Sequence, residues 1–240
     1  MKGTSPKGTA GEREASAYVR QMFAEVAPKY DLLNHLLSFH IDKLWRARTV
    51  KRLESILLRP DSVVLDVCCG TGDLALALRR SSQGAVLGSD FCHPMLQAAR
   101  SKSPGSSTWF ESDALALPVR DRSLDAVTVA FGFRNLANSE NGLRELRRVL
   151  RPGGIAAILE FSTPPNPAFA AFYNFYSRRI LPVIGGAISG SRDAYTYLPE
   201  SVRKFPDAPT LAVWMQNAGF KSVAFERMTF GIVALHLATA

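Results

Sequence analysis

Cysteine and histidine are scarce in this chain of 240 residues, which has three cysteines and four histidines. Cys68 and Cys69 are neighbours and poorly placed to bridge each other, so no disulfide framework is possible and we expect a reducing compartment. The pair lacks the C-x-x-C spacing of a zinc site, and the histidines are scattered. We therefore predict no metal site, and we interpret Cys68, Cys69 and Cys92 as small apolar fillers.

Long apolar runs are also missing. The longest uncharged stretch, residues 161–177, contains three prolines and two asparagines, which a bilayer core does not tolerate cheaply. Residues 1–11 are rich in glycine, threonine, lysine and proline and have no apolar centre, so they are predicted to form a flexible tail and not a signal peptide. These absences favour a cytoplasmic protein without a transmembrane helix.

Acidic residues are outnumbered by basic ones, 21 against 29, which gives a net charge of +8. The cations are spread along the chain, with only short pairs such as Arg79-Arg80 and Arg178-Arg179. Solvated helix faces explain this distribution better than a nucleic-acid surface, so we expect no nucleic-acid partner. The net positive charge still allows anionic ligands and anionic membrane surfaces as partners.

The composition, 47% hydrophobic and 21% charged residues, indicates a globular protein. The length favours one domain, residues 12–240, with a substantial insertion. In residues 12–60 apolar side chains recur at three- and four-residue spacing until Pro60 and Asp61, which predicts a helical preface.

From residue 63 onward short apolar runs alternate with helical patterns. Strands that are buried on both faces have this character, and repeated βα units predict an α/β fold with a doubly wound parallel sheet. The alternation breaks in residues 161–206, which we interpret as an inserted lid. The last two runs are expected to pair antiparallel, which makes seven strands in all. The predicted strands are residues 63–67, 85–90, 108–110, 124–130, 155–159, 222–225 and 232–237, and the predicted helices are residues 74–80, 94–102, 140–150 and 210–218.

A turn of small residues, C-C-G-T-G-D, joins the first predicted strand to the next helix. Gly70 and Gly72 lack a Cβ, so a ligand could approach the backbone closely near a helix N-terminus. Asp90 ends the second strand and is placed to accept hydrogen bonds from ribose hydroxyls. The pattern indicates a nucleotide-like ligand.

The same turn lacks the third glycine of a dinucleotide site and the lysine of a P-loop, which disfavours a nicotinamide dehydrogenase. Asp73 would repel a phosphate and suits a ligand with a positive charge. The residues alone leave another interpretation open, in which the glycines form only a tight turn while Asp66 and Asp73 are helix caps.

The run D-x-x-C-G-T-G-D at residues 66–73, followed by S-D-F at 89–91, M-L at 95–96, D-A at 113–114 and Pro118, resembles the class I S-adenosylmethionine-dependent methyltransferases. The resemblance implies a Rossmann-like fold and S-adenosylmethionine as cofactor. In that family the glycine loop faces the methionine part, the acid of the second strand binds the ribose, and a residue like Asp113 lies by the adenine. The implied cofactor residues are Asp66, Gly70, Thr71, Gly72, Asp90, Phe91, Asp113 and Ala114.

A narrower resemblance extends over residues 23–236. The motifs Y-D-L-L-N at 30–34, F-G-F-R-N at 131–135, R-V-L-R-P-G-G at 148–154 and Y-L-P-E-S-V at 197–202 are similar to the ubiquinone/menaquinone biosynthesis C-methyltransferase family. Two positions depart from the family pattern. Asp42 stands where the family usually has histidine, and we assign no catalytic role to the nearby His40. Ala130 stands where the family often has serine, so a cofactor contact through that hydroxyl is lost.

This narrower resemblance implies transfer of a methyl group from S-adenosylmethionine to a ring carbon of a polyprenylated quinol, demethylmenaquinol or demethylphylloquinol. A benzoquinol of ubiquinone biosynthesis and an unrelated small-molecule acceptor are the alternatives. A binding module without enzymatic activity is the rival of another class.

The chemistry explains the candidate catalytic residues. A ring carbon becomes nucleophilic when the adjacent hydroxyl gives up its proton, and the charge that develops needs a fixed cation. Arg134 stays charged and can hold this oxyanion, Asn135 can orient the hydroxyl or a water, and both follow the fourth strand. Tyr30 can hydrogen-bond the same oxygen. A structural ion pair of Arg134 and a buried, satisfied Tyr30 are the alternatives.

The aromatic stretch of residues 169–176 suits either a channel for the apolar quinone tail or a contact with the bilayer, with Arg178 and Arg179 facing anionic headgroups. Core packing of a lid helix is the other interpretation. We expect peripheral contact with the inner face of the membrane. A homodimer is compatible with the sequence, which does not decide the oligomeric state.

Overall fold

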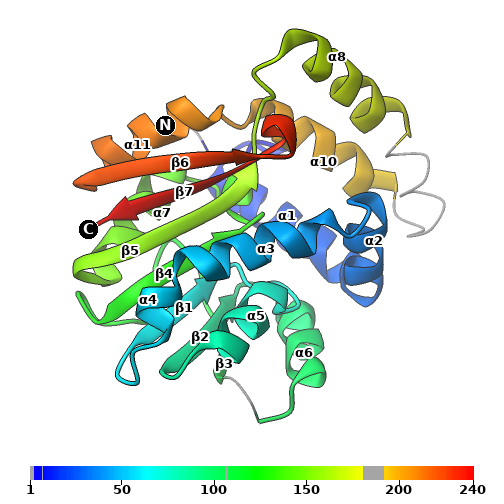
Figure 1. The fold of residues 1–240 in the computed structure, drawn as a ribbon. Coiled ribbons are helices and arrows are strands. Elements are labelled where there is room, and N and C mark those ends of the chain that lie inside the picture. Colours follow the sequence, from blue (N-terminus) through cyan, green and yellow to red (C-terminus); the bar gives the residue numbers. More distant parts are fainter. Residues whose placement is uncertain (1–2, 7, 106–107, 181–191) are drawn as a thin grey trace.

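The computed structural model describes residues 3–6, 8–105, 108–180 and 192–240. Its centre is a seven-stranded sheet in the order β3-β2-β1-β4-β5-β7-β6, in which β7 runs antiparallel to the other six strands (Figure 1). The predicted doubly wound sheet with an antiparallel C-terminal strand is confirmed. The strands are β1 (Val63–Val67), β2 (Ala85–Asp90), β3 (Thr108–Glu111), β4 (Leu124–Ala130), β5 (Leu150–Phe161), β6 (Ser222–Met228) and β7 (Val233–Thr239).

Both faces of the sheet are buried under helices (Figure 1). On one face lie α7 (Ser139–Val149), which packs on β5, and α11 (Ala208–Asn217), which packs on β6 and β7. The other face carries α3 (Ile41–Arg52), α4 (Glu54–Leu57) and α5 (Asp73–Ser81). Because both faces are covered, the central strands consist almost wholly of apolar residues, which is what made them recognisable in the sequence.

Parallel pairing brings the carboxyl ends of β2, β1, β4 and β5 to one edge of the sheet. Apart from Tyr30, the candidate site residues lie at the carboxyl ends of β1 and β2 or in the loops after β1, β2, β3 and β4. Ligands of open α/β sheets bind at this edge, so the topology places the candidate site there.

The predicted preface is helical, as expected, and its first helices lie beside that edge. It consists of α1 (Glu12–Val26), the 3-10 turn Ala27–Lys29 and α2 (Tyr30–Leu37), followed by α3 and α4 on the sheet. The tail before α1 is partly packed: the Thr4 N–H donates to the Leu136 carbonyl at 2.7 Å, and Thr4 Oγ1 lies 2.8 Å from the Tyr197 hydroxyl. The flexibility of residues 1–11 stays a prediction.

The inserted segment, predicted at residues 161–206, contains α8 (Pro167–Phe175), a π-helical turn (Tyr176–Ile180) and α10 (Arg192–Lys204). Part of its Gly/Ser-rich stretch lies outside the described residues. No residue of α8 is buried, and Phe172 and Phe175 are 64% and 60% exposed. Core packing therefore does not explain Phe172 and Phe175.

Several predicted boundaries differ from the structure, most of all at the start of β5. The helix expected over residues 140–150 ends at Val149, and the R-P-G-G run that follows belongs to β5, which was expected to begin only at residue 155. Gly153 adopts a positive φ of 82° there, and Arg151 and Pro152 lead into the strand. A glycine and a proline are tolerated where a β-bulge interrupts the hydrogen bonding between two strands. The register between β4 and β5 shifts at this point.

Gly72 provides a test of how closely the glycine loop packs against Trp109. Its φ is 85°, and a Cβ built there would lie 2.6 Å from the Trp109 ring. Replacement by alanine is expected to lower the free energy of unfolding by about 2–4 kcal/mol, from left-handed strain plus overpacking. Gly153→Ala is the matched control, because Gly153 has φ 82° with nothing within 4 Å of its Cβ position. Urea denaturation of both variants measures the difference, and equal losses would contradict the overpacking.

Candidate active site

Three cavities follow one another from the loops after β1 and β2 to the inserted segment. The loop cavity, of about 680 Å³ out to its open mouth, is lined by Gly70, Asp90, Phe91, Asp113 and Ala114 among others. The middle cavity shares Phe23, Tyr30 and Phe131 with it. The aromatic groove shares Asn34, Ser38, Trp45 and Phe161 with the middle cavity and continues between α2 and α8.

Asp90 organises the loop cavity. Its carboxylate accepts hydrogen bonds from the backbone N–H of Gly70 at 2.8 Å and of Cys92 at 2.9 Å, and it is 6% exposed. Burial raises its pKa to about 6, although these N–H groups oppose the rise. A carboxylate oxygen has two lone pairs, so Asp90 can still accept hydrogen bonds from a ligand at the cavity wall.

The rest of this cavity suits an adenosine-like group. Phe91 and the buried Met95 supply apolar walls, and Ala114 is also buried. Asp113 is exposed at the rim, where its Oδ1 accepts the Leu115 N–H at 2.9 Å. Five of the eight predicted cofactor residues thus meet around one space: Gly70, Asp90, Phe91, Asp113 and Ala114.

The other three, Asp66, Thr71 and Gly72, are not among the residues that line it. The Asp66 carboxylate accepts the Thr128 hydroxyl at 2.6 Å and the Ala75 N–H, so it holds the start of α5, as the cap interpretation expected; burial raises its pKa to about 7. The Thr71 hydroxyl donates to Asp31. Gly72 faces Trp109, so the Cβ that it lacks would collide with protein and not with a ligand.

Asp73 also differs from the expectation that it would face a charged ligand. It forms ion pairs with Lys102 at 2.7 Å and Arg46 at 3.8 Å, on the side of the loop toward α2 and α6 (His93–Lys102). It does not line the loop cavity.

The middle cavity contains the hydroxyl of Tyr30. Burial raises the pKa of Tyr30 above its usual value, while a hydrogen bond with Asn34 and the positive charges of Arg134 and Arg46 oppose the rise. The phenol therefore stays protonated and can donate at neutral pH. The two arginines create a field at this point that favours a negatively charged oxygen.

Arg134 lines the same cavity but is already engaged. Its Nη1 lies 2.9 Å from Glu160 Oε1 and donates also to the Phe131 carbonyl, and its Nε donates to Ser201 Oγ at 3.3 Å. The side chains of Arg134 and Glu160 are 5% and 1% exposed. The structural ion pair that the sequence left open as an alternative is present. Glu160 was missed, although a lone acid after the apolar run of residues 155–159 was its signal.

Asn135 lines the loop cavity and is held from the other side. Its Oδ1 accepts the Tyr197 hydroxyl at 3.0 Å, and Nδ2 points to the Phe131 carbonyl at 3.5 Å. Tyr197 in turn meets Thr4, so the insertion and the tail both help to place this amide.

The aromatic groove is the largest of the three spaces, about 1810 Å³ including its open side. Phe169, Phe172, Tyr173 and Tyr176 of the inserted segment line one wall, and Trp45 and Phe161 lie at its inner end. The Tyr176 hydroxyl donates to the Leu37 carbonyl at 3.2 Å, which ties the insertion to α2.

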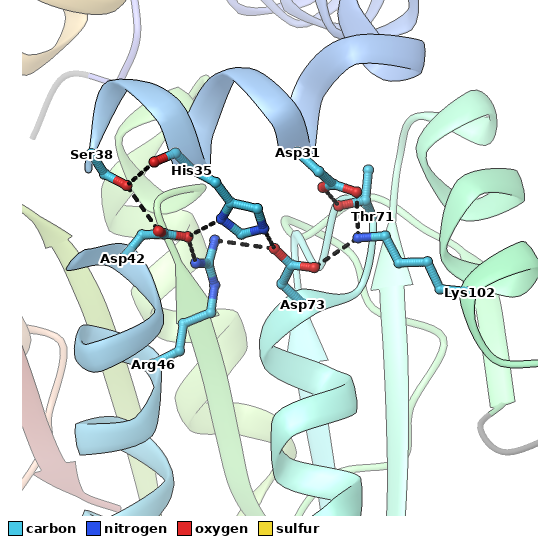
Figure 2. Close-up of polar contacts among 8 residues, drawn as sticks. All are labelled: Asp31, His35, Ser38, Asp42, Arg46, Thr71, Asp73 and Lys102. Atoms are coloured by element: carbon cyan, nitrogen blue, oxygen red, sulfur yellow. Dashed lines mark hydrogen bonds and ion pairs between the residues drawn. The ribbon is translucent and has the colours of Figure 1, made fainter. Parts of the chain in front are cut away.

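Both departures from the family pattern lie at these cavities. Ala130 lines the loop cavity. Asp42 accepts hydrogen bonds from Ser38 at 2.8 Å and from Arg46, and its Oδ2 lies 2.7 Å from Nδ1 of His35 (Figure 2). These hydrogen bonds, with Arg46, hold the pKa of Asp42 below its usual value, although burial opposes this. The imidazole expected at position 42 is thus found across from it, on α2.

A family model described as the ubiE/COQ5 methyltransferase family matches residues 11–240. The chain belongs to this family. It is therefore an S-adenosylmethionine-dependent methyltransferase, as the resemblance implied.

Individual relatives agree. The chain is 50% identical to a demethylmenaquinone methyltransferase of Thermus thermophilus over 90% of this chain and 98% of the relative. It is 43% identical to a ubiquinone/menaquinone biosynthesis C-methyltransferase of Geobacter sulfurreducens, over 93% and 88% of the two chains. A crystal structure of a SAM-dependent methyltransferase from Thermotoga maritima, 17% identical, matches with a TM-score of 0.65 over 91% of this chain and 98% of its own, which supports the fold.

Proposed function

We propose that this methyltransferase transfers the methyl group of S-adenosylmethionine to a ring carbon of demethylmenaquinol. Its relatives from Thermus thermophilus and Deinococcus radiodurans are named demethylmenaquinone methyltransferases. The observation that carries the proposal is the order of the three cavities, in which a nucleoside site, a polar chamber and an open apolar groove share walls. A substrate with a small polar ring and a long apolar tail matches this order.

The cofactor supplies an electrophilic methyl group on its sulfonium. Tyr30 lines both the loop cavity and the middle cavity, so a ring held against it lies at the boundary between cofactor and acceptor. Its protonated hydroxyl can donate to the quinol oxygen, and Arg134 and Arg46 favour negative charge at that oxygen. Charge on the oxygen raises the electron density at the neighbouring ring carbon, which would take the methyl group while S-adenosylhomocysteine leaves and the proton of that carbon passes to water. The surrounding rings of Trp45, Phe131 and Phe161 keep water out and hold the acceptor in place.

Asn135 can orient the quinol hydroxyl or a water from the cofactor side, since its amide is fixed by Tyr197. We expect that the reaction needs no strong general acid or general base, because the positioning of the substrates and a fixed cation together lower the activation barrier to methyl transfer.

A methylation assay tests the proposal. The purified enzyme is incubated with S-adenosylmethionine labelled in its methyl group and with reduced demethylmenaquinol, and the label in the extracted quinone is measured. The matched acceptors are a benzoquinol with the same prenyl tail and menaquinol that already carries the methyl group. We expect label in the demethylated naphthoquinol, at least tenfold above both controls. A higher rate with the benzoquinol would favour the ubiquinone precursor, and no label in either would contradict the function.

We also propose peripheral contact with an anionic membrane at the mouth of the aromatic groove. Among the described residues no helix is long and apolar enough to cross a bilayer. Large side chains that are more than half exposed lie on three segments near the groove, with Phe39, Phe172 and Phe230 at 71%, 64% and 78%. The exposed Arg179 follows on the same insertion. Such a rim suits an interface where tails lie below anionic headgroups.

Flotation with anionic liposomes at low salt measures this contact. Replacing Phe172 and Phe175 by serine is expected to remove most of the bound fraction, because each buried aromatic side chain contributes about 1.5–3 kcal/mol to partition. Val213→Ser is the control, since Val213 is 50% exposed on α11 outside the groove. Equal flotation of all three proteins would refute the contact at this rim.

A further inference from the structure

A polar network joins the preface to the glycine loop (Figure 2). Asp31 lies 2.5 Å from Lys102 Nζ and accepts the Thr71 hydroxyl. Lys102 reaches Asp73 as well, at 2.7 Å. We call the group of Asp31, Thr71, Asp73 and Lys102 the α2 clamp.

A second set of contacts extends the clamp along the same helix. His35 lies between two carboxylates, with Nδ1 2.7 Å from Asp42 and Nε2 3.7 Å from Asp73. Arg46 also joins these two carboxylates (Figure 2). Although His35, Asp42 and Asp73 lie within 4.8 Å of one another, the Arg46 guanidinium binds both acids. A metal ion would have to displace that cation, so we interpret the network as a structural connection between elements.

The clamp and the cavities use different positions of one helix. Tyr30, Asn34 and Ser38 are four residues apart, so they follow one stripe of α2, and they line the middle cavity. Asp31 and His35 each follow a cavity residue by one position, which turns their side chains onto the neighbouring stripe. The clamp therefore fixes the rotation of α2 about its axis and its position relative to the glycine loop, and with them the residues that line the cavities.

The clamp acts next to the point where α2 meets the cofactor cavity. Tyr30 Cε1 lies 3.9 Å from the Cβ position of Gly70, and Gly70 lines the loop cavity directly before Thr71. A shift of α2 away from the loop would therefore widen that cavity and withdraw Tyr30 at the same time. Its three charged side chains are between 20% and 35% exposed, so their ion pairs are partly screened, whereas Thr71 is buried.

We propose that Asp31 and Lys102 are positioning residues for cofactor binding: their ion pair holds α2 on the glycine loop, so that Tyr30 closes over Gly70. The proposal rests on the use of S-adenosylmethionine and not on the identity of the quinol. According to this proposal, the contact between the preface and the glycine loop helps to determine the affinity for the cofactor.

A double-mutant cycle tests it, with Asp31→Asn, Lys102→Met and the double variant titrated with S-adenosylhomocysteine by calorimetry. We expect each single variant to bind S-adenosylhomocysteine about 5–20-fold more weakly than the wild type does. The double variant should bind no more weakly than the single variant with the lower affinity, because both substitutions remove the same ion pair. In a methyl-transfer assay the KM for the cofactor should rise by a similar factor while kcat at saturation stays within about twofold. Lys102→Arg should restore binding.

The control is Lys51→Met, which removes an exposed lysine from a 2.7 Å ion pair with Glu54 far from the loop. Wild-type affinity in the single variants, losses that add in the double variant, or a loss matched by the control would overturn the proposal. A variant that melts earlier but binds normally would do so too, since that result limits the clamp to stability. The titration needs no quinol, so a failure to methylate demethylmenaquinol leaves this test intact.

Discussion

Replacing Arg134 by methionine is expected to reduce methyl transfer by about 10²–10³-fold, the usual effect of removing one group that stabilises a developing oxyanion. The same change leaves the Glu160 carboxylate buried without its partner, because Arg134 is its 2.9 Å ion-pair partner. Breaking a buried pair in this way costs about 3–5 kcal/mol of folding free energy. Steady-state kinetics and urea denaturation measure the two effects.

The double variant Arg134→Met, Glu160→Gln separates them. The glutamine carries no charge, yet its carbonyl oxygen can still accept one of the backbone N–H groups of Arg134 and Phe161 that now donate to Glu160. We expect the double variant to recover most of the lost stability but none of the activity. If the activity returns together with the stability, Arg134 serves the site only as half of a structural pair. Single Glu160→Gln should keep the arginine and most of the activity.

The strands were the most predictable part of the molecule. β1, β2 and β4 span the residues expected from the sequence, because strands that are covered on both faces must be apolar throughout. The edge strand β6 extends three residues past its predicted run, since an edge strand tolerates polar residues such as Glu226, and β7 beside it extends two residues past its own. The R-P-G-G run was left outside the strand predicted at residues 155–159, because the start of β5 is bulged and its register with β4 shifts there, which the pattern of apolar residues does not reveal.

The site residues were predictable where the backbone position alone places them at the cavity. They were less predictable where the side chain can face either the cavity or another part of the protein. Gly70 and Asp90 meet because parallel strands β1 and β2 end together. Gly72 and Thr71 lie in the same turn, but what they face is set by Trp109 and Asp31, which are distant in the sequence. The partner of Arg134 was equally hidden, since Glu160 is 26 residues away and adjacent only through the pairing of β4 with β5.

Replacing Asp90 by asparagine is expected to weaken binding of S-adenosylhomocysteine by about 10²–10³-fold. The carboxylate accepts the N–H groups of Gly70 and Cys92 and would also accept ribose hydroxyls. Hydrogen bonds to a charged group are worth about 1.5–3 kcal/mol each, and the asparagine NH₂ must face at least one donor. Calorimetric titration at pH 7 measures the loss, and Glu111→Gln, an exposed acid at the end of β3, is the control. A loss below about threefold would mean that Asp90 only shapes the loop.

The pH dependence of binding gives Asp90 a second signature. Its pKa is raised to about 6 by burial, so in the free protein its contribution to stability is fully present below its ordinary pKa near 4 and is lost as the pH rises through 6. Ligand hydroxyls donate to the ionised form, so cofactor affinity should change in the opposite direction and fall about tenfold from pH 7 to pH 5. Asp66 also titrates, near 7, but it is turned away from the cavity and remains in the Asp90→Asn variant. The difference between the two titration curves therefore isolates Asp90, and an equally steep decline in the variant would assign the effect to another group.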